Sequence, residues 1–274
     1  MPNKTFLLSA LTLLCLVQIF PAGNAYCESV SVDTSPRNDT APTLAQAWDV
    51  FSGYYKNTGK IDGTIALTDE ILSLDPRNVA ALVFLSRVWL TYGYVKARTK
   101  EDLMRAFENG VSAAEKAIEI EPDNPDAHFF YVANLASLGD TKGLFNSLFM
   151  LPEVRRELEL VLELDPDHAN GLAMTGALYL YLPSILGGDL HISEVYLKRS
   201  LSVDSHLTSA ELYLALNLKK QKKYDEALGV LYDLVKDKNP SFYPDWFENR
   251  KYAYMMISRI KEETERETAR REEE

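Results

Sequence analysis

The chain has 274 residues, of which 46% are apolar, so it can bury the core of one large domain or two small ones, and a disordered or collagenous chain is excluded. Lys and Arg number 29 against 40 for Asp and Glu, and the net charge of −11 disfavours a general electrostatic interaction with nucleic acid or anionic lipid. The two cysteines are too few for a disulfide scaffold or a cysteine-based zinc site.

Residues 1–25 are predicted to be an export signal. A short segment carrying Lys4 precedes an apolar run over residues 5–20, which is shorter than a comfortable bilayer span. Gly23 and Ala25 occupy the small-residue positions that a signal peptidase recognises, so cleavage is expected after Ala25. The alternative is an uncleaved membrane anchor.

The mature chain is expected to be an acidic, exported, periplasmic protein. No small residue directly precedes Cys15 or Cys27, so a lipid anchor is not expected. Cys15 leaves with the signal, and Cys27 then has no intramolecular partner. Residues 26–41 are rich in Ser, Thr, Asp, Asn and Pro and are predicted to form a flexible leader.

From residue 42 onward, helical apolar periodicity stops repeatedly at turn signals, which indicates an internal repeat. Trp48 and Tyr55 on a first helix, followed by Pro76 after a second, resemble the tetratricopeptide repeat (TPR) of about 34 residues. The chain is therefore predicted to be an all-α, TPR-like solenoid over residues 42–260. The five expected helix pairs cover residues 45–77, 79–122, 125–166, 169–205 and 208–240.

The C-terminal part is expected to close the solenoid. Residues 242–260 are predicted to form a capping helix, because apolar residues recur there at helical spacing. Residues 261–274 are nearly all charged, with opposite charges four residues apart, and are expected to fray as a solvated tail.

Three of the repeats carry insertions between their two helices, near residues 94–105, 140–151 and 181–189. In a solenoid such insertions lie on one face and often surround the binding surface. The alternative is that they are merely longer connectors.

Motifs for chemistry are lacking. The sequence has no phosphate-binding loop, zinc helix, nucleophile elbow or dinucleotide fingerprint, so an enzyme, a cofactor and a metal are not expected. The four histidines are predicted to cap helices or lie at the surface rather than to bind metal: His128, His168, His191 and His206. Gly187, Gly188 and Asp189 are better explained by a turn and helix N-cap than by an anion-binding loop.

A binding surface is the remaining functional prediction. In TPR proteins the concave wall comes mainly from the first helix of each repeat, and at those positions this chain is mostly apolar and aromatic. A ligand, a partner segment or the chain's own C-terminal helix is expected to cover such a wall. The predicted groove residues are Phe84, Arg87, Phe129, Phe130, Met174, Tyr181, Leu212, Tyr213 and Leu216.

Residues 45–240 also resemble one family more closely. The segment Leu182-Pro183-Ser-Ile-Leu-Gly187-Gly188-Asp189, together with Pro125-Asp-Ala-His-Phe-Phe-Tyr, is similar to the TPR protein associated with TRAP transporters, the TatT-like family. This resemblance implies a periplasmic homotrimer that engages the transporter's substrate-binding protein and a small, partly hydrophobic ligand. The alternative is a general periplasmic scaffold that holds an envelope complex together without a small ligand.

Overall fold

The computed structural model describes residues 41–272, with side chains as far as residue 270, and this part of the chain is all α-helical. The predicted export signal, nearly all of the leader, Cys15 and Cys27 lie outside the described residues. The described chain divides after Pro166 into two compact units.

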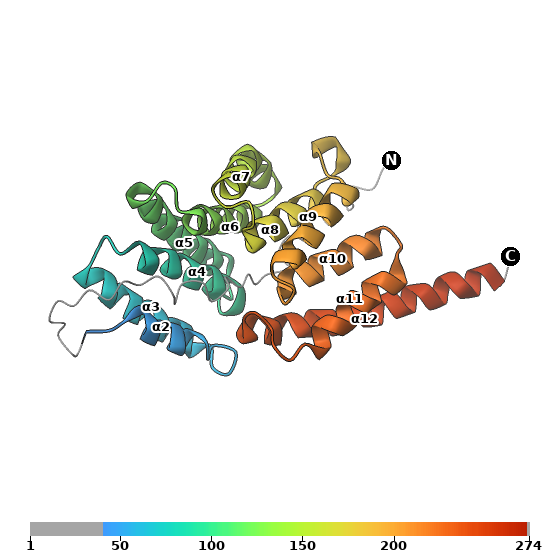
Figure 1. The fold of residues 1–274 in the computed structure, drawn as a ribbon, viewed down its shortest axis with the longest axis horizontal. Coiled ribbons are helices and arrows are strands. Elements are labelled where there is room, and N and C mark those ends of the chain that lie inside the picture. The colour runs from blue at the N-terminus through green and yellow to red at the C-terminus, as the bar shows by residue number, and fades with distance from the viewer. Residues whose placement is uncertain (1–40, 273–274) are drawn as a thin grey trace. The chain divides into compact units, whose positions relative to one another are not determined.

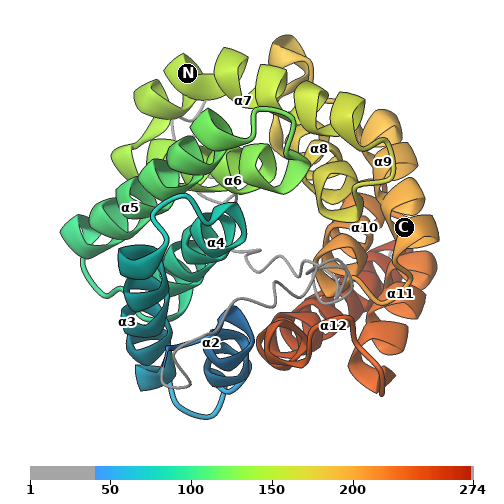
Figure 2. The ribbon, with the colours of Figure 1, turned by 60° about the vertical axis from the view of Figure 1, so that its left-hand side comes forward.

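The N-terminal unit, residues 41–166, is a series of helices in which each packs on the next (Figures 1 and 2). In addition, α4 packs on α6, as expected for stacked helical hairpins. The helices are α2 (Leu44–Phe51), α3 (Gly59–Leu74), α4 (Val79–Val95), α5 (Lys100–Ile120), α6 (Pro125–Lys142) and α7 (Leu144–Leu164).

The C-terminal unit, residues 167–272, repeats this arrangement. Here α8 packs on α9 and α10, α9 packs on α10, and α12 packs on both α10 and α11. The helices are α8 (Ala169–Tyr181), the 3-10 turn η3 (Ser184–Leu186), α9 (Leu190–Val203), α10 (Thr208–Lys220), α11 (Tyr224–Lys236) and α12 (Tyr243–Glu272). The all-α prediction is confirmed.

Polar side chains fix where several helices begin. Asn78 and Asn124 each accept a hydrogen bond from the backbone N–H three residues further on, and the ring of His168 does the same for α8. These bonds satisfy amides that have no partner within the helix. Because each follows a predicted turn, the starts of α4, α6 and α8 were readable from the sequence.

Aromatic rings fill the core of the N-terminal unit. The ring of Phe84 on α4 lies 4.5 Å from Trp48 and 5.5 Å from Phe51, measured between centroids. Tyr94 and Phe107 join α4 to α5 at 5.1 Å. These contacts tie successive hairpins together through apolar burial.

Aliphatic and aromatic side chains from all five helices form the core of the C-terminal unit. Trp246 and Ile260 of α12 belong to the same cluster as Leu212 and Tyr213 of α10. The indole N–H of Trp246 donates to the carbonyl of Leu234 at 2.8 Å. The last helix therefore covers one side of α10.

Helices cross closely where the chain places glycine. A Cβ at Gly93 would lie 2.3 Å from the ring of Phe107, and one at Gly176 would lie 2.6 Å from Leu197. Both glycines thus permit a hairpin whose helices a larger residue would separate.

Two of the predicted insertions are helical rather than loop-like. The residues near 94–105 extend α4 and α5, and those near 140–151 form the end of α6 and the first turns of α7. Only the third insertion, near 181–189, makes an irregular turn around η3. At the C-terminus, α12 continues to Glu272, held by ion pairs from Lys219 to Glu263 (2.7 Å) and from Lys222 to Glu267 (2.9 Å).

Candidate functional site

The clearest candidate site of the N-terminal unit is a groove between α3, α4 and α5, which we call the α3–α5 groove. Its volume is about 390 Å³. Helices α3 and α5 form its walls and α4 its floor. The lining residues are Asp69, Leu72, Pro76, Leu82, Leu85, Trp89, Asn109, Ser112, Ala113 and Lys116.

This groove has an apolar floor and a charged rim. Leu82, Leu85 and Ala113 are buried, and Trp89 is half-buried with its ring 5.3 Å from that of Tyr92. At the rim, partial burial raises the pKa of Asp69, while the nearby Lys116 ammonium opposes that shift.

Such a groove suits a peptide segment. Apolar side chains can enter it, while the opposite charges of Asp69 and Lys116 contact polar groups at its edge. The lining combines apolar residues with the polar side chains of Asn109 and Ser112 as well as the two charged ones, so a bound segment can make both kinds of contact.

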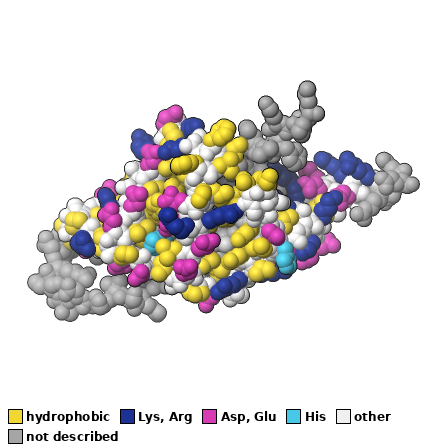
Figure 3. Space-filling view, turned by 90° about the horizontal axis from the view of Figure 1, so that it is seen from above, with side chains coloured by type: hydrophobic (Ala, Val, Ile, Leu, Met, Phe, Trp, Pro, Cys, Tyr) yellow, Lys and Arg dark blue, Asp and Glu magenta, His cyan; other side chains and the backbone are white. Residues whose placement is uncertain are grey.

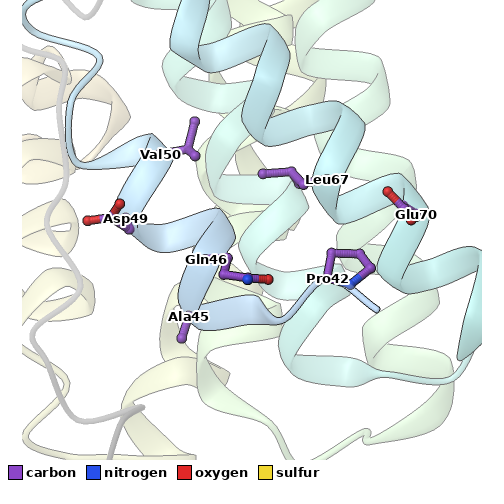
Figure 4. A pocket seen from close by; sticks show the side chains of 7 residues that line it. All are labelled: Pro42, Ala45, Gln46, Asp49, Val50, Leu67 and Glu70. Atoms are coloured by element: carbon purple, nitrogen blue, oxygen red, sulfur yellow. The ribbon is translucent and has the colours of Figure 1, made fainter. Parts of the chain in front are cut away.

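A second pocket of about 700 Å³ lies between α2 and α3 (Figure 4). Val50 and Leu67 project between the two helices, and Asp49 and Glu70 lie on opposite sides in this view. Both charged residues are acidic, so this pocket offers no basic group to a ligand.

The predicted groove residues of the N-terminal unit are in its interior. Phe84, Phe129 and Phe130 are at most 3% exposed, and Arg87 is 2% exposed. The guanidinium of Arg87 lies over the ring of Trp48, 4.8 Å from the centroid. These side chains pack against neighbouring hairpins, so they do not form an open wall in this structure.

The predicted groove residues of the C-terminal unit are also largely covered. Met174, Tyr181, Leu212 and Tyr213 are buried, and Leu216 is partly buried against the same core. The rings of Tyr181 and Tyr213 meet edge to face at 6.2 Å. For α10, the covering element includes the chain's own C-terminal helix.

Burial shifts the pKa values of polar side chains around Tyr181 and Tyr213. It raises the pKa values of Tyr181 and Tyr213, and the Tyr181 hydroxyl has no hydrogen-bond partner among the described residues. Burial lowers the pKa of Lys220, whose ammonium donates to the carbonyl of Leu180 at 2.8 Å.

The Leu182 to Asp189 motif builds a turn. Gly187 has a φ of 85°, and a Cβ at Gly188 would lie 1.7 Å from the carbonyl oxygen of Leu182. The Asp189 carboxylate accepts from the amides of His191 and Ile192, which lowers its pKa. The expected turn and N-cap are confirmed. Leu182 is buried in this turn, and Pro183 is half-buried at its start.

The four histidines occupy separate places. His168 caps α8 and His191 is exposed, whereas His206 pairs with Asp237 at 2.9 Å. His128 is buried, not capping: it pairs with Glu157 at 2.7 Å and with the carbonyl of Pro122 at 2.8 Å. Within residues 41–272 no group of three or more His, Cys, Asp or Glu side chains could hold a metal ion.

Sequence reasoning missed the α3–α5 groove. Leu72 and Lys116 belong to second helices of their repeats, where periodicity predicts packing alone. The groove is lined jointly by α3, α4 and α5, and the spacing of three helices leaves no local signal in the sequence.

Comparisons with known proteins agree with the architecture. The TPR protein TTC0263 of Thermus thermophilus is similar in structure, with a TM-score of 0.58 and 15% identity over 77% of this chain and 98% of that one. Two crystal structures of MamA match at a TM-score of 0.40 and 14% identity, over 76% of this chain and 96% or 91% of theirs. No curated protein matches the chain.

A family model gives the relationship by sequence. The model described as "Regulator of microtubule dynamics protein 1-3" matches residues 43–181, just over half of the chain. This match spans the described N-terminal unit from α2 onward and continues through α8. The chain belongs to the family of the regulator of microtubule dynamics proteins 1-3, and its fold is TPR-like.

Proposed function

We propose that this chain is a non-enzymatic scaffold that binds a segment of a partner protein in the α3–α5 groove. The observation that carries the proposal is the groove itself, with an apolar floor and opposite charges at its rim. The TPR-like fold supports protein–protein interaction as the general role.

The groove favours a short amphipathic segment as the bound element. Leu72 and Trp89 are half-buried, so apolar side chains of the partner would remove their remaining surface from water. Asp69 and Lys116 would then orient the segment, because each attracts the opposite charge.

Site-specific photo-crosslinking in the native host tests this function. A photoreactive residue at Ser112, an exposed position lining the groove, should give a discrete protein adduct. The same residue at Ser202, exposed on α9 outside the groove, is the matched control and should give none. The change Leu72→Asp should abolish the Ser112 adduct. Equal labelling from both positions would contradict the proposal.

The finer function that we infer is accessory to a TRAP-type transporter, and it rests on the resemblance of the Leu182 to Asp189 motif and its spacing. In that role the chain would be a periplasmic homotrimer that engages a substrate-binding protein and a small hydrophobic ligand. Native mass spectrometry of the protein isolated from its host reports subunit number, bound molecules and retained partners together. A bare monomer would contradict this role and leave the scaffold function in place.

A further inference from the structure

The beginning of α7 exposes apolar side chains to an unusual degree. Phe145 and Phe149 are 85% and 86% exposed, one helical turn apart on the same face. We call the segment Leu144–Leu151 the α7 overhang. Figure 3 looks onto the side of the molecule that carries α7 and shows hydrophobic side chains reaching the surface there.

The remainder of α7 behaves differently. Val154, Leu158 and Val161 are buried, so the helix is anchored by its last three turns. Pro152 separates the anchored part from the overhang. Exposure of the two phenylalanines is therefore a property of one helix end and not of a poorly packed helix.

The charges around the overhang are as distinctive as its hydrophobicity. The overhang itself contains no Asp or Glu, although Asp140 precedes it and Glu153 follows one helical turn after Phe149. Glu153 accepts a hydrogen bond from the Tyr131 hydroxyl at 2.8 Å. The N-cap is Gly143, which has no side chain to cap the helix, so the positive end of the helix dipole lies beside Phe145. Lys142 adds a cation at the same end, paired at 3.0 Å with Glu108.

The exposed apolar area of the α7 overhang is small for a stable interface with a second copy of the chain. A phenylalanine side chain buries roughly 150–250 Å². A standard protein interface needs about 800 Å² from each partner. Two protruding rings supply about half of that.

We propose that the α7 overhang attaches the protein to the surface of a phospholipid bilayer by inserting Phe145 and Phe149 among the lipid tails. Amphipathic helix ends bind membranes in this way when an apolar face meets the acyl chains. The phosphate groups of the lipids would then face the uncapped helix N-terminus, which favours anions.

The proposed attachment involves the overhang alone. In the described part of the chain, no helix has the length and hydropathy needed to cross a bilayer. Because the whole chain is acidic, anionic lipids repel it, and we expect the insertion to be stronger on zwitterionic phosphatidylcholine than on vesicles that also contain phosphatidylglycerol.

Flotation with phosphatidylcholine vesicles tests this inference on the mature chain. The double change Phe145→Ser, Phe149→Ser should reduce the vesicle-bound fraction at least about tenfold. Because both side chains are exposed, the helical circular dichroism spectrum and its melting should stay unchanged. Leu74→Ser, which removes a side chain 65% exposed on α3 beside Asp75, is the matched control and should bind as the unaltered chain does.

A direct probe of insertion completes the test. Phe149→Trp should show blue-shifted fluorescence on vesicles and quenching by lipids brominated in the acyl chain, above the signal of the native tryptophans. Equal vesicle binding by the double variant, or no binding by the unaltered chain, would overturn the proposal. So would a stable oligomer that the double variant loses, because the overhang would then be a protein interface.

Discussion

The two units bury polar side chains in different ways. In the N-terminal unit the amide nitrogen of Asn134 donates to the Ser86 hydroxyl at 3.0 Å and to the carbonyl of Phe130 at 2.9 Å. The buried ring of His128 lies between two acceptors, Glu157 and the carbonyl of Pro122. Asn134 thus joins α6 to α4 through Ser86, and His128 joins α6 to α7 through Glu157.

In the C-terminal unit, Glu211 is only 8% exposed, and one of its carboxyl oxygens has no hydrogen-bond partner among the described residues. Burial, and then the charges of Asp237, Asp233 and Asp204, raise its pKa to about 8. The Glu211 carboxyl therefore retains its proton to a higher pH than a solvated carboxyl does. The contrast is local to Glu211, because elsewhere in the C-terminal unit Asn249 of α12 donates to the Thr208 hydroxyl of α10 at 2.9 Å.

The largest expected effect is a pH dependence confined to the C-terminal unit. The Glu211 carboxyl has an unfolded pKa near 4.5 and a folded pKa near 8, so the folded state holds the proton more tightly. The contribution of Glu211 to the free energy of unfolding is fully present below pH 4.5. It decreases as pH rises toward 8, by up to about 5 kcal/mol. Glu211→Gln should remove this fall.

Hydrogen exchange resolved by peptide can follow α10 and α4 separately while pH is varied. Protection in α10 should decline from pH 5 to pH 8 after correction for intrinsic exchange, and Glu211→Gln should flatten the decline. Glu226→Gln, at an exposed carboxylate of α11, is the control and should leave it intact. An identical decline in the Glu211 variant would contradict protonation as the cause.

The next effect addresses the N-terminal unit. Glu157→Ala leaves the buried ring of His128 without its carboxylate partner and should destabilise that unit by about 1–3 kcal/mol. Replacing both members, His128→Leu with Glu157→Leu, should recover most of this loss, because no buried polar group then remains unpaired. Thermal melting measures both, with the exposed Glu163→Ala as control. Equal losses in the single and double variants would show that the pair is not the determinant.

The smallest effect tests the close approach of α5 to α6. A Cβ at Gly110 would lie 2.1 Å from the Asn134 side-chain oxygen, so Gly110→Ala should cost about 1–2 kcal/mol after the gain in helix propensity. Asn134→Ala removes the clash, and the two changes should be strongly non-additive in a double-mutant cycle. Additive losses would mean that the amide does not limit the spacing.

The sequence predicted the helices well because their boundaries are encoded locally. Pro125 and Asp189 start helices where a proline at the first turn and an N-cap carboxylate were expected. Burial of the predicted groove residues was harder to predict, because the sequence of an apolar face on α10 is the same whether α12 or a ligand covers that face. Exposure of Phe145 was not predicted either, because an apolar run indicates a core until tertiary structure shows otherwise.

Pro152 also affects how readily mutations can change the exposed surface of the α7 overhang. Its ring nitrogen cannot donate to the carbonyl of Leu148, so the turns before it are joined to the anchored part of α7 by fewer hydrogen bonds. Substitutions at the exposed Phe145 and Phe149 then alter the surface at little cost to folding, whereas Ser147 and Met150 lie against Gly139 of α6. Evolution can therefore add or remove membrane attachment at the α7 overhang without changing the packed helical hairpins that support it.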